Sequence, residues 1–435
     1  MTAKLSQPVD TRIAKIDSSF EGKLVRLRGW VYKRRDIGGA AFIILRDGSG
    51  LIQVAFKRGS LPPEQYETVR RVGLESSCEV TGVVKSDPRA PGGLEVHAVS
   101  FRLVGDCKDY PIAKKKHGVE FLLDHRHLWI RSPKVAAVLR VRAELLKAAR
   151  EWFEAHDYIE VTAPSIVTAA VEGGATLFEL EYFGRKAYLT QSSQFYLEAA
   201  IFSLGRAYTI QPSFRAEKSR TRRHLTEFTH MEGEAAFMDL NQLMIELEDL
   251  VSYMCREVVE RRKRELEELG RRFTPPEPPF PRISYDEAIE IAQSKGVPIE
   301  WGEDLSTESE RAVSSEFEKP VLVHRYPREV KAFYHKPDPE NPKVVLCTDM
   351  LAPEDTGEII GGGQRIHDYQ ELVKRIEECG LDVEDYEWYL DLRRYGSVPH
   401  SGFGLGVERV VKWICGLSHV REATLIPRTP VRVYP

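Results

Sequence analysis

YTIQPSFRAEKSRTRRHLTEFTHMEGEAAF, residues 208–237, predicts two β-strands joined by a basic loop. The first arm is partly apolar, and the loop 218–223 places four cations in six residues. The second arm alternates with the period of a strand. Its two faces separate His224, Phe228, Glu232 and Glu234 from Leu225, Thr229 and Met231. One face therefore carries an aromatic ring and two carboxylates, next to a cluster of guanidinium groups.

Such a face can hold a nucleoside triphosphate beside a substrate that carries an ammonium group. Arginine pairs with phosphate oxygens in a bidentate fork. A phenyl ring can stack on a purine, and carboxylates accept hydrogen bonds from an amine or an amide. A surface hairpin whose cations only face water is equally compatible with this stretch alone, because basic loops are common. The rest of the chain has to decide between the two.

The composition is that of a globular chain with two or three domains, given 435 residues. No apolar run reaches the roughly 18 residues of a membrane-spanning helix, and residues 1–10 lack the apolar core of a signal peptide. The six cysteines are scattered without a CxxC pair. We therefore expect free thiols in a reducing, cytoplasmic compartment, with no membrane contact and neither zinc nor disulfides.

Charge is distributed unevenly along the chain. Residues 1–116 contain 21 Lys and Arg against 13 Asp and Glu, whereas the whole chain contains 62 against 66. A basic N-terminal part on an acidic body predicts a polyanionic partner for the N-terminal part, although a chance fluctuation would look the same.

Residues 20–104 predict about five short strands and one short helix near 63–72. The turn Asp47-Gly48-Ser49-Gly50 joins two of these strands. This pattern is typical of an OB-fold β-barrel, which binds single-stranded nucleic acid with aromatic platforms and a basic groove. We predict an OB-fold domain at 1–104, a hinge at 105–133, and a catalytic domain at 134–435 with a helical insertion near 239–320.

The predicted catalytic domain contains three segments whose order along the chain is informative. A helix at 133–156 is followed by a strand that ends at Pro164. Then comes Phe214-Arg215-Ala216-Glu217, a loop, and Arg223-His224-Leu225-Thr226-Glu227-Phe228. Near the C-terminus, GFGLGVER at 402–409 places three glycines before a helix with Glu408 and Arg409. Each segment is weak by itself, but together they resemble motifs 1, 2 and 3 of the class II aminoacyl-tRNA synthetases.

Within that class, GWVYKRRD and AFIILRDGSGLIQVAF resemble the anticodon-binding barrel of the aspartyl, asparaginyl and lysyl branch. The resemblance covers essentially the whole chain. It implies an α+β protein, with a five-stranded OB-fold barrel and a catalytic domain built on an antiparallel sheet flanked by helices. It also implies a homodimer that forms through motif 1.

The resemblance assigns roles at the nucleotide. Arg215 would clamp the α-phosphate of ATP, and Phe228 would stack on adenine. Arg223 and Arg409 would bind the outer phosphates. Glu217, His224 and Leu225 would line the ATP site. Asp349 and Glu358 would hold Mg²⁺. Carboxylates with phosphate oxygens are the ligands that Mg²⁺ prefers.

The resemblance also assigns the amino-acid and tRNA contacts. Glu172 would meet the α-ammonium group, Ser192 and Gln194 the substrate backbone, and Arg365 a carboxylate or the side chain. In the barrel, Phe42 would stack on an anticodon base and Arg28 would contact phosphate. Gln53 and Glu95 would bind base edges.

The choice of amino acid depends on QSSQFYL at 191–197. In the aspartyl enzymes a lysine, which pairs with the substrate carboxylate, stands where this chain has Leu197. Leucine cannot neutralise a desolvated carboxylate, and an unpaired buried charge is costly. Glu232 would repel that carboxylate but accept a hydrogen bond from an amide. We therefore expect activation of L-asparagine with ATP to asparaginyl-adenylate, and transfer to the 3′ end of tRNA-Asn.

Three alternatives remain open at this point. One is an aspartyl enzyme that also charges tRNA-Asn, for which Arg365 is the obvious cation. Another is an asparagine synthetase paralogue, which would characteristically lack the barrel. The last is a tRNA-binding protein with an inactive catalytic domain, against which the intact Arg215, Glu358 and Arg409 argue.

Overall fold

The computed structural model describes residues 7–37, 39–112, 116–168, 177–218 and 223–435, and the chain forms two compact units. The first unit is Met1–Gly118 and the second is Val119–Pro435. The division falls inside the stretch 105–133 that the sequence marks as a hinge. Among the described residues, no helix combines the length and apolarity needed to cross a bilayer.

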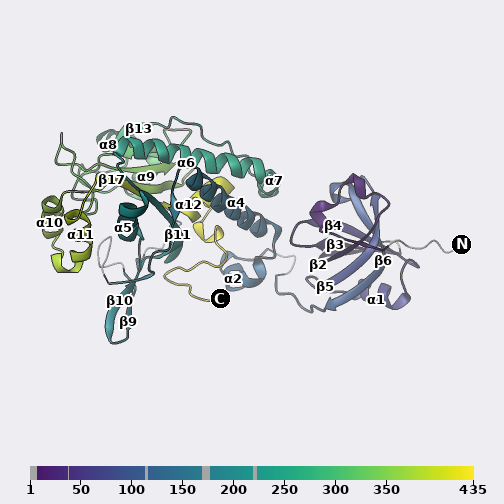
Figure 1. The fold of residues 1–435 in the computed structure, drawn as a ribbon. Coiled ribbons are helices and arrows are strands. Elements are labelled where there is room, and N and C mark those ends of the chain that lie inside the picture. Colours follow the sequence, from purple (N-terminus) through teal and green to yellow (C-terminus); the bar gives the residue numbers. More distant parts are fainter. Residues whose placement is uncertain (1–6, 38, 113–115, 169–176, 219–222) are drawn as a thin grey trace. The chain divides into compact units, whose positions relative to one another are not determined.

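The first unit is a β-barrel with one helix (Figure 1). Its strands are β1 (Val9–Asp10), β2 (Leu24–Ile37), β3 (Ala40–Arg46), β4 (Leu51–Lys57), β5 (Ser77–Ser86) and β6 (Leu94–Gly105), with helix α1 at Pro63–Arg71. The sheet order is β1-β2-β3-β4-β6-β5, and a further pairing of β2 with β5 closes it. Alternate residues of each long strand are buried, so one face of the strands forms an apolar barrel interior.

The second unit is built on an eight-stranded sheet with the order β13-β14-β15-β16-β17-β12-β11-β7. Its strands are β7 (Ile159–Glu160), β11 (Arg206–Phe214), β12 (Glu227–Ala236), β13 (Arg282–Ser284), β14 (Val321–His324), β15 (Cys347–Ala352), β16 (Gly357–Gln364) and β17 (His400–Gly406). The pairings from β14 to β11 are antiparallel, and only the two edge pairs are parallel. The expected antiparallel central sheet is confirmed.

Helices α4 (Pro133–Ala155), α6 (Leu240–Arg261) and α12 (Val407–Cys415) pack on the sheet, and α4 and α6 lie side by side (Figure 1). Proline in the first turn of α4 loses no hydrogen bond. Asp239 and Gln242 form a capping box at the start of α6. Met231 and Ala235 of β12 point into this core. The even-numbered residues of β12 therefore face the opposite side of the sheet.

The charged stretch 239–272 forms two helices: α6 ends at Arg261, and α7 occupies Lys263–Leu269. Helices α8 (Tyr285–Ser294) and α9 (Thr307–Ser314) form a further apolar cluster with β14 and β15. Helices α10 (Tyr369–Glu378) and α11 (Glu387–Arg394) pack with Phe195 of α5 (Gln194–Leu204). Short helices α2 (Val119–Asp124) and α3 (Arg126–Trp129) precede α4.

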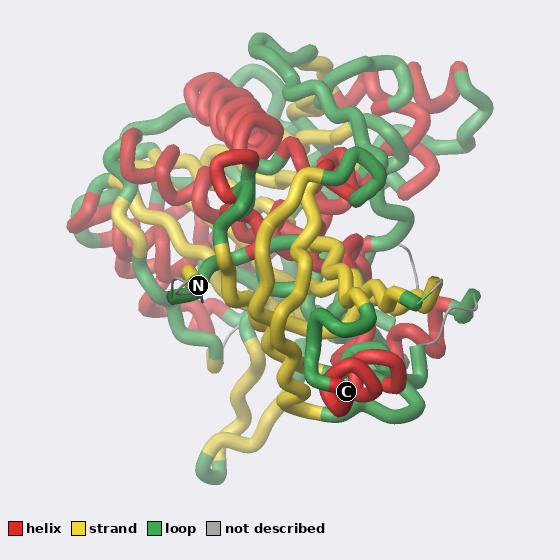
Figure 2. Tube along the Cα trace, turned by 90° about the vertical axis from the view of Figure 1, so that its right-hand side faces the viewer, coloured by secondary structure: helices red, strands yellow, loops and turns green. Residues whose placement is uncertain are grey.

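A small sheet of β8 (Ile166–Val167), β9 (Glu179–Tyr182) and β10 (Arg185–Leu189) lies apart from the central one. The β9–β10 hairpin extends from the lower edge of the unit in both Figures 1 and 2. Phe183 at its tip is 90% exposed.

Candidate active site

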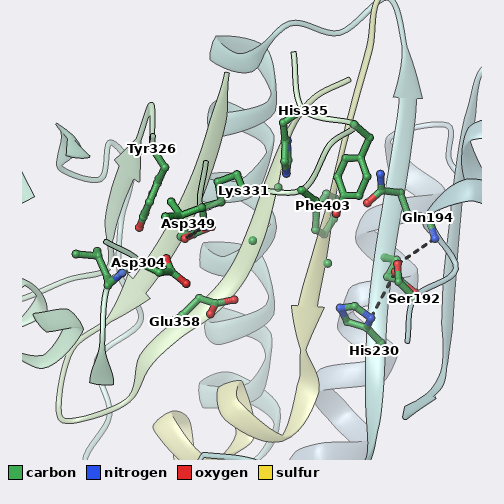
Figure 3. Close-up of a pocket in the computed structure, with 18 of the residues that line it drawn as sticks. Ser192, Gln194, His230, Asp304, Tyr326, Lys331, His335, Asp349, Glu358 and Phe403 are labelled. Carbon is green, nitrogen blue, oxygen red and sulfur yellow. Dashed lines mark hydrogen bonds and ion pairs between the residues drawn. The ribbon is translucent and has the colours of Figure 1, made fainter. Parts of the chain in front are cut away.

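A cavity of about 460 Å³ lies over the face of the central sheet that α4 and α6 leave free. Asp349 and Glu358 gather at one end of it, and Ser192 and Gln194 at the other (Figure 3). Strands β12, β15, β16 and β17 each contribute lining residues, so the site is built on rigid neighbouring strands.

Glycines leave space above this face of the sheet, because they carry no side chains. A Cβ atom on Gly402 would lie 1.7 Å from Oε2 of Glu234, and one on Gly404 would lie 2.4 Å from Nε2 of His230. The glycine run at 402–406 therefore makes room for side chains of the neighbouring strand β12. It belongs to a strand, not to the glycine-rich turn of a dinucleotide site.

Glu232 and Ser192 meet at the amino-acid end of the cavity. The Ser192 hydroxyl donates to Glu232 Oε1, and the backbone N–H of Ser193 donates to Glu232 Oε2 at 2.9 Å. Glu232 is 2% exposed and lines the cavity, and its carboxylate can accept further hydrogen bonds beyond these two. Gln194, on the first turn of α5, lines the same end. Ser192, Gln194 and Glu232 are thus brought together as the sequence predicts.

Arg365 lines the cavity while it is held from behind by Glu234. Its Nε and Nη2 donate to the two Glu234 oxygens at 3.0 and 3.1 Å. Both side chains are almost wholly buried. This bidentate pair fixes the guanidinium plane and neutralises its charge internally.

Asp349 and Glu358 extend from adjacent strands, on either side of Gly361. A Cβ atom on Gly361 would lie 3.3 Å from Asp349 Oδ1 and 3.5 Å from Glu358 Oε1. The Lys331 ammonium group contacts Asp349 Oδ2 at 2.6 Å. Two carboxylates over a bare backbone form a donor set that suits Mg²⁺.

The two carboxylates differ in acidity. Burial raises the pKa of Asp349 to about 6, and the charge of Glu358 adds to this effect against the opposing Lys331. Burial would also raise the pKa of Glu358, but Arg409 and Lys331 lower it to about 2. Glu358 is therefore ionised at neutral pH, and cations on both sides maintain that charge.

A second, smaller cavity of about 60 Å³ adjoins the first, with Arg215, His230, Glu358 and Gly404 lining both. The Arg215 guanidinium lies 5.5 Å from the centre of the Phe228 ring. His224, Leu225 and Arg409 also line this cavity, as predicted for a nucleotide site. Burial, with Arg409, Arg223 and Arg215 nearby, lowers the pKa of His224 to about 4, so its imidazole is neutral at pH 7.

Arg223 lines the small cavity but also forms a buried ion pair with Glu310 of helix α9. The distance between Nη2 and Oε2 is 2.5 Å. Arg409 donates from Nη1 to the carbonyl oxygen of Glu358 at 2.8 Å. Both arginines are therefore held by protein groups at the end of the site where outer phosphates are expected.

Two predicted site residues are placed elsewhere, and a third is not described. Leu197 is wholly buried with Ile201 and Ala207 and does not line the cavity, so the prediction that it borders the substrate pocket is wrong as a direct contact. Helix α5 begins at Gln194, and its turn aims position 197 at an apolar cluster. Glu217 follows β11 and lines neither cavity. Glu172 lies outside the described residues.

In the barrel, Phe42 and Gln53 lie on neighbouring strands β3 and β4 and are not part of the apolar interior. Gln53 Nε2 donates to Glu95 Oε2 at 2.8 Å across the β4–β6 pair. Arg28 is largely exposed and donates from Nε to Glu79 Oε2 at 2.8 Å. Phe42, Gln53 and Glu95 thus belong to connected strands β3, β4 and β6 of one sheet.

Among the described residues at or behind the site, several were not predicted, including Glu198, His230, Glu310 and Lys331. His230 could have been found, because it shares the even-numbered face of β12 with Phe228 and Glu232. Glu198 follows Gln194 by one helical turn, but only if the helix start is known. Lys331 and Glu310 carry no local signal, since they approach the site from distant loops and helices.

Comparison with known proteins supports both units. A family model described as tRNA synthetases class II (D, K and N) matches residues 118–430. A second model, described as an OB-fold nucleic acid binding domain, matches residues 25–104.

Two curated relatives are similar over nearly their whole length. The asparagine–tRNA ligase of Thermococcus kodakarensis is 57% identical over 427 residues, which cover 97% of this chain and 98% of the relative. That of Chloroflexus aurantiacus is 51% identical over 426 residues, which cover 96% and 97%.

Two solved structures differ in how similar they are to this chain. Asparaginyl-tRNA synthetase from Pyrococcus horikoshii, complexed with asparaginyl-adenylate, is 52% identical with a TM-score of 0.95, covering 98% of this chain and 99% of that one. Aspartyl-tRNA synthetase from Entamoeba histolytica is 27% identical with a TM-score of 0.86, covering 98% and 93%.

Proposed function

The chain belongs to the class II tRNA synthetases of the D, K and N group, and from this membership we propose that it is an asparagine–tRNA ligase. It activates L-asparagine with ATP and transfers the asparaginyl group to tRNA. The observation that carries the choice of amino acid is Glu232, a carboxylate fixed by Ser192 and Ser193 at the wall of the cavity.

Glu232 favours an amide over a carboxylate on the substrate. It accepts an N–H from asparagine, whereas the oxygens of aspartate bring only acceptors and a second negative charge. The aspartyl alternative needs a cation for its substrate, and Arg365 is already paired with Glu234 through both oxygens. A neutral side chain therefore matches the charge of this pocket.

In the first step, an oxygen of the asparagine α-carboxylate forms a bond to the α-phosphorus of ATP, and the bond to the pyrophosphate oxygen breaks. Arg215 lies between the two cavities and so at the junction of amino acid and nucleotide. Phe228 offers its ring to adenine, and Arg223 and Arg409 face the departing phosphates. The side chains act by holding the reactants and balancing charge, as is usual for phosphoryl chemistry.

Asp349 and Glu358 would hold Mg²⁺, which neutralises phosphate charge when bound. Both carboxylates lie within 3.5 Å of the position that a Cβ atom of Gly361 would take, and this closeness supports the assignment. Lys331, which contacts Asp349, offers a positive charge at the same place. In the second step, a ribose hydroxyl at the 3′ end of tRNA takes the asparaginyl group, and AMP leaves.

The barrel would bind the anticodon of tRNA-Asn. Phe42 offers a face for stacking, and Gln53 is fixed by Glu95 so that its carbonyl oxygen can accept from a base. The excess of cations in residues 1–116 supports a nucleic-acid partner.

A homodimer would form through residues 133–164. Strand β7 is the edge of the central sheet, and its Ile159 is 49% exposed. Uncovered sheet edges with apolar side chains favour association. Sedimentation velocity on Ile159→Lys tests this assignment, since a charged edge should shift the protein to monomer. A cytoplasmic location is proposed from the six free cysteines, because unpaired thiols persist in reducing compartments.

ATP–pyrophosphate exchange with asparagine and with aspartate tests the function directly. Exchange with asparagine, and at least a hundredfold less with aspartate, is expected because an unpaired buried charge costs several kcal/mol. Equal exchange with aspartate would instead establish a relaxed aspartyl enzyme. Absence of exchange with both would point to a tRNA-binding protein.

A further inference from the structure

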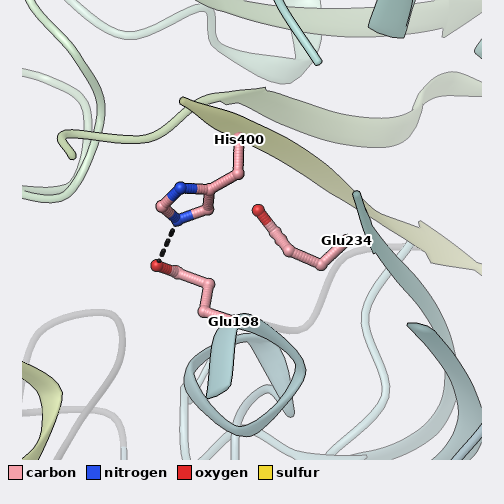
Figure 4. A group of neighbouring side chains, drawn as sticks. All are labelled: Glu198, Glu234 and His400. Carbon is pink, nitrogen blue, oxygen red and sulfur yellow. Dashed lines mark hydrogen bonds and ion pairs between the residues drawn. The ribbon is translucent and has the colours of Figure 1, made fainter. Parts of the chain in front are cut away.

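Behind the amino-acid end of the cavity lies a group of wholly buried charged side chains around Glu198 (Figure 4). Glu198 comes from α5, Arg393 from α11 and His400 from β17. Arg393 Nη2 donates to Glu198 Oε2 at 2.5 Å, and His400 Nε2 lies 2.9 Å from the same oxygen. The Tyr389 hydroxyl lies 2.9 Å from both carboxylate oxygens.

Glu198, Glu234 and His400 lie close enough together to ligate a metal ion. Two arginines already form ion pairs with these carboxylates: Arg365 pairs with Glu234, and Arg393 pairs with Glu198. The charge balance is therefore achieved by side chains, and a divalent cation would have to displace a buried guanidinium group.

Glu198 remains a carboxylate in this setting. Burial alone would raise its pKa, but Arg393 and His400 hold the pKa below the ordinary value. An ionised carboxylate only accepts hydrogen bonds. Any amide that faces Glu198 must therefore turn its NH₂ group toward it.

Gln194 is that amide. It lies one helical turn before Glu198, and its Nε2 donates to Glu198 Oε1 at 2.9 Å. Because Gln194 also lines the cavity, its carbonyl oxygen is left to face the substrate. Gln194 and Glu232 then present two acceptors to the same end of the cavity.

We propose that Glu198 is a positioning residue for amino-acid recognition, which holds the Gln194 amide with its oxygen toward an N–H donor of the bound amino acid. The inference rests on the proposed function and deepens it. The donor can be the α-ammonium group or the side-chain amide, since both donate N–H hydrogen bonds to a carbonyl oxygen. Arg393, His400 and Tyr389 keep Glu198 in place.

The test is ATP–pyrophosphate exchange with Glu198→Gln. Glutamine at 198 can offer either its oxygen or its NH₂ group, so Gln194 is no longer held in one orientation. We expect the KM for asparagine to rise about tenfold, as for loss of one hydrogen bond of about 1.4 kcal/mol, while the KM for ATP stays the same. If the donor is the side-chain amide, the preference for asparagine over aspartate also falls. If it is the α-ammonium group, the preference is kept.

A double-mutant cycle separates positioning from a general structural role. Gln194→Met removes the acceptor, so adding Glu198→Gln to it should raise the KM no further. Independent, multiplying effects of the two substitutions would overturn the proposal. So would a wild-type KM for asparagine in Glu198→Gln.

Glu248→Gln is a matched control. Glu248 is 3% exposed, accepts from Arg282 Nε at 2.8 Å and does not line the cavity. It should leave the KM for asparagine unchanged. If Glu198→Gln fails to fold, Tyr389→Phe loosens Glu198 without removing its charge, and it should raise the same KM by a few-fold. A wild-type protein that shows no exchange with asparagine would refute the function itself, whereas normal exchange in Glu198→Gln refutes only this inference.

Discussion

Arg223 and Glu310 form a buried ion pair that connects the smaller cavity to helix α9, 87 residues away in sequence. The Glu310 oxygen that accepts from Arg223 also accepts the backbone N–H of Glu358 at 2.6 Å. A Cβ atom on Gly357 would lie 2.4 Å from this oxygen, so only glycine fits beside it. One carboxylate therefore positions Arg223, which is proposed to bind phosphate, and the backbone of a candidate metal ligand.

We expect Glu310→Ala to raise the KM for ATP about tenfold without changing that for asparagine, because removing one partner of a buried pair leaves the other uncompensated. Glu310→Gln keeps an acceptor for both donors and should restore most of the affinity. Initial-rate exchange assays measure both constants. Glu308→Gln, on the exposed side of the same helix, is the control. An equal rise in both KM values would contradict a role specific to the nucleotide.

Alanine substitutions along β17 test the packing of its glycines against β12. Gly402→Ala would push its Cβ into Glu234, so we expect it to destabilise the protein by about 1–3 kcal/mol or more. Gly404→Ala meets only the His230 ring and should be less destabilising. Gly406→Ala has its nearest neighbour, Arg409 Cδ, at 3.5 Å and should be tolerated. Urea unfolding gives the order, and a Gly406 variant as unstable as the Gly402 variant would refute the argument.

His224 should make the protein sensitive to acid. Its pKa is lowered to about 4 from an ordinary 6.5, so the unfolded chain binds a proton between these values that the folded chain does not. Stability from this residue is therefore complete above pH 6.5 and is lost as the pH falls toward 4. Relative to His224→Asn, the wild type should lose stability between pH 7 and pH 4.5. Urea midpoints at the two pH values measure this, and parallel losses would contradict it.

Substitutions in the barrel should separate tRNA binding from amino-acid activation. Gln53→Ala removes the proposed base contact, so kcat/KM for tRNA should fall about ten- to a hundredfold, as for a lost base contact of about 1–3 kcal/mol. Phe42→Ala should have a similar effect through lost stacking. ATP–pyrophosphate exchange without tRNA should not change in either variant. A parallel loss of exchange would show that the barrel substitutions disturb the whole chain.

Leu197→Lys tests the residue on which the choice of substrate was argued from sequence. Leu197 is wholly buried with Ile201 and Ala207, so a lysine there must bury an ammonium group. We expect lower stability and loss of asparagine exchange. A gain of aspartate exchange at full stability would show that the lysine reaches the cavity and would restore Leu197 as a direct specificity residue.

The sequence by itself determined those features that follow from local periodicity. Alternation along residues 227–236 placed Phe228, Glu232 and Glu234 on one face; in the structure Phe228 and Glu232 line the two cavities, and Glu234 pairs with Arg365. The run of strands in residues 20–104 likewise predicted the barrel that the structure contains. A strand has a period of two whatever it packs against, so these assignments needed no distant information.

Tertiary structure alone decided which partners each charged group has. Arg365 with Glu234, Arg223 with Glu310, Lys331 with Asp349 and Arg393 with Glu198 join residues that lie 18 to 195 positions apart. The fold also separates two neighbours in the sequence. Helix α5 places Leu197 in an apolar cluster, whereas Glu198 accepts a hydrogen bond from Gln194. Pairing of buried charges depends on which surfaces meet when the chain folds, and no local pattern in the sequence encodes that meeting.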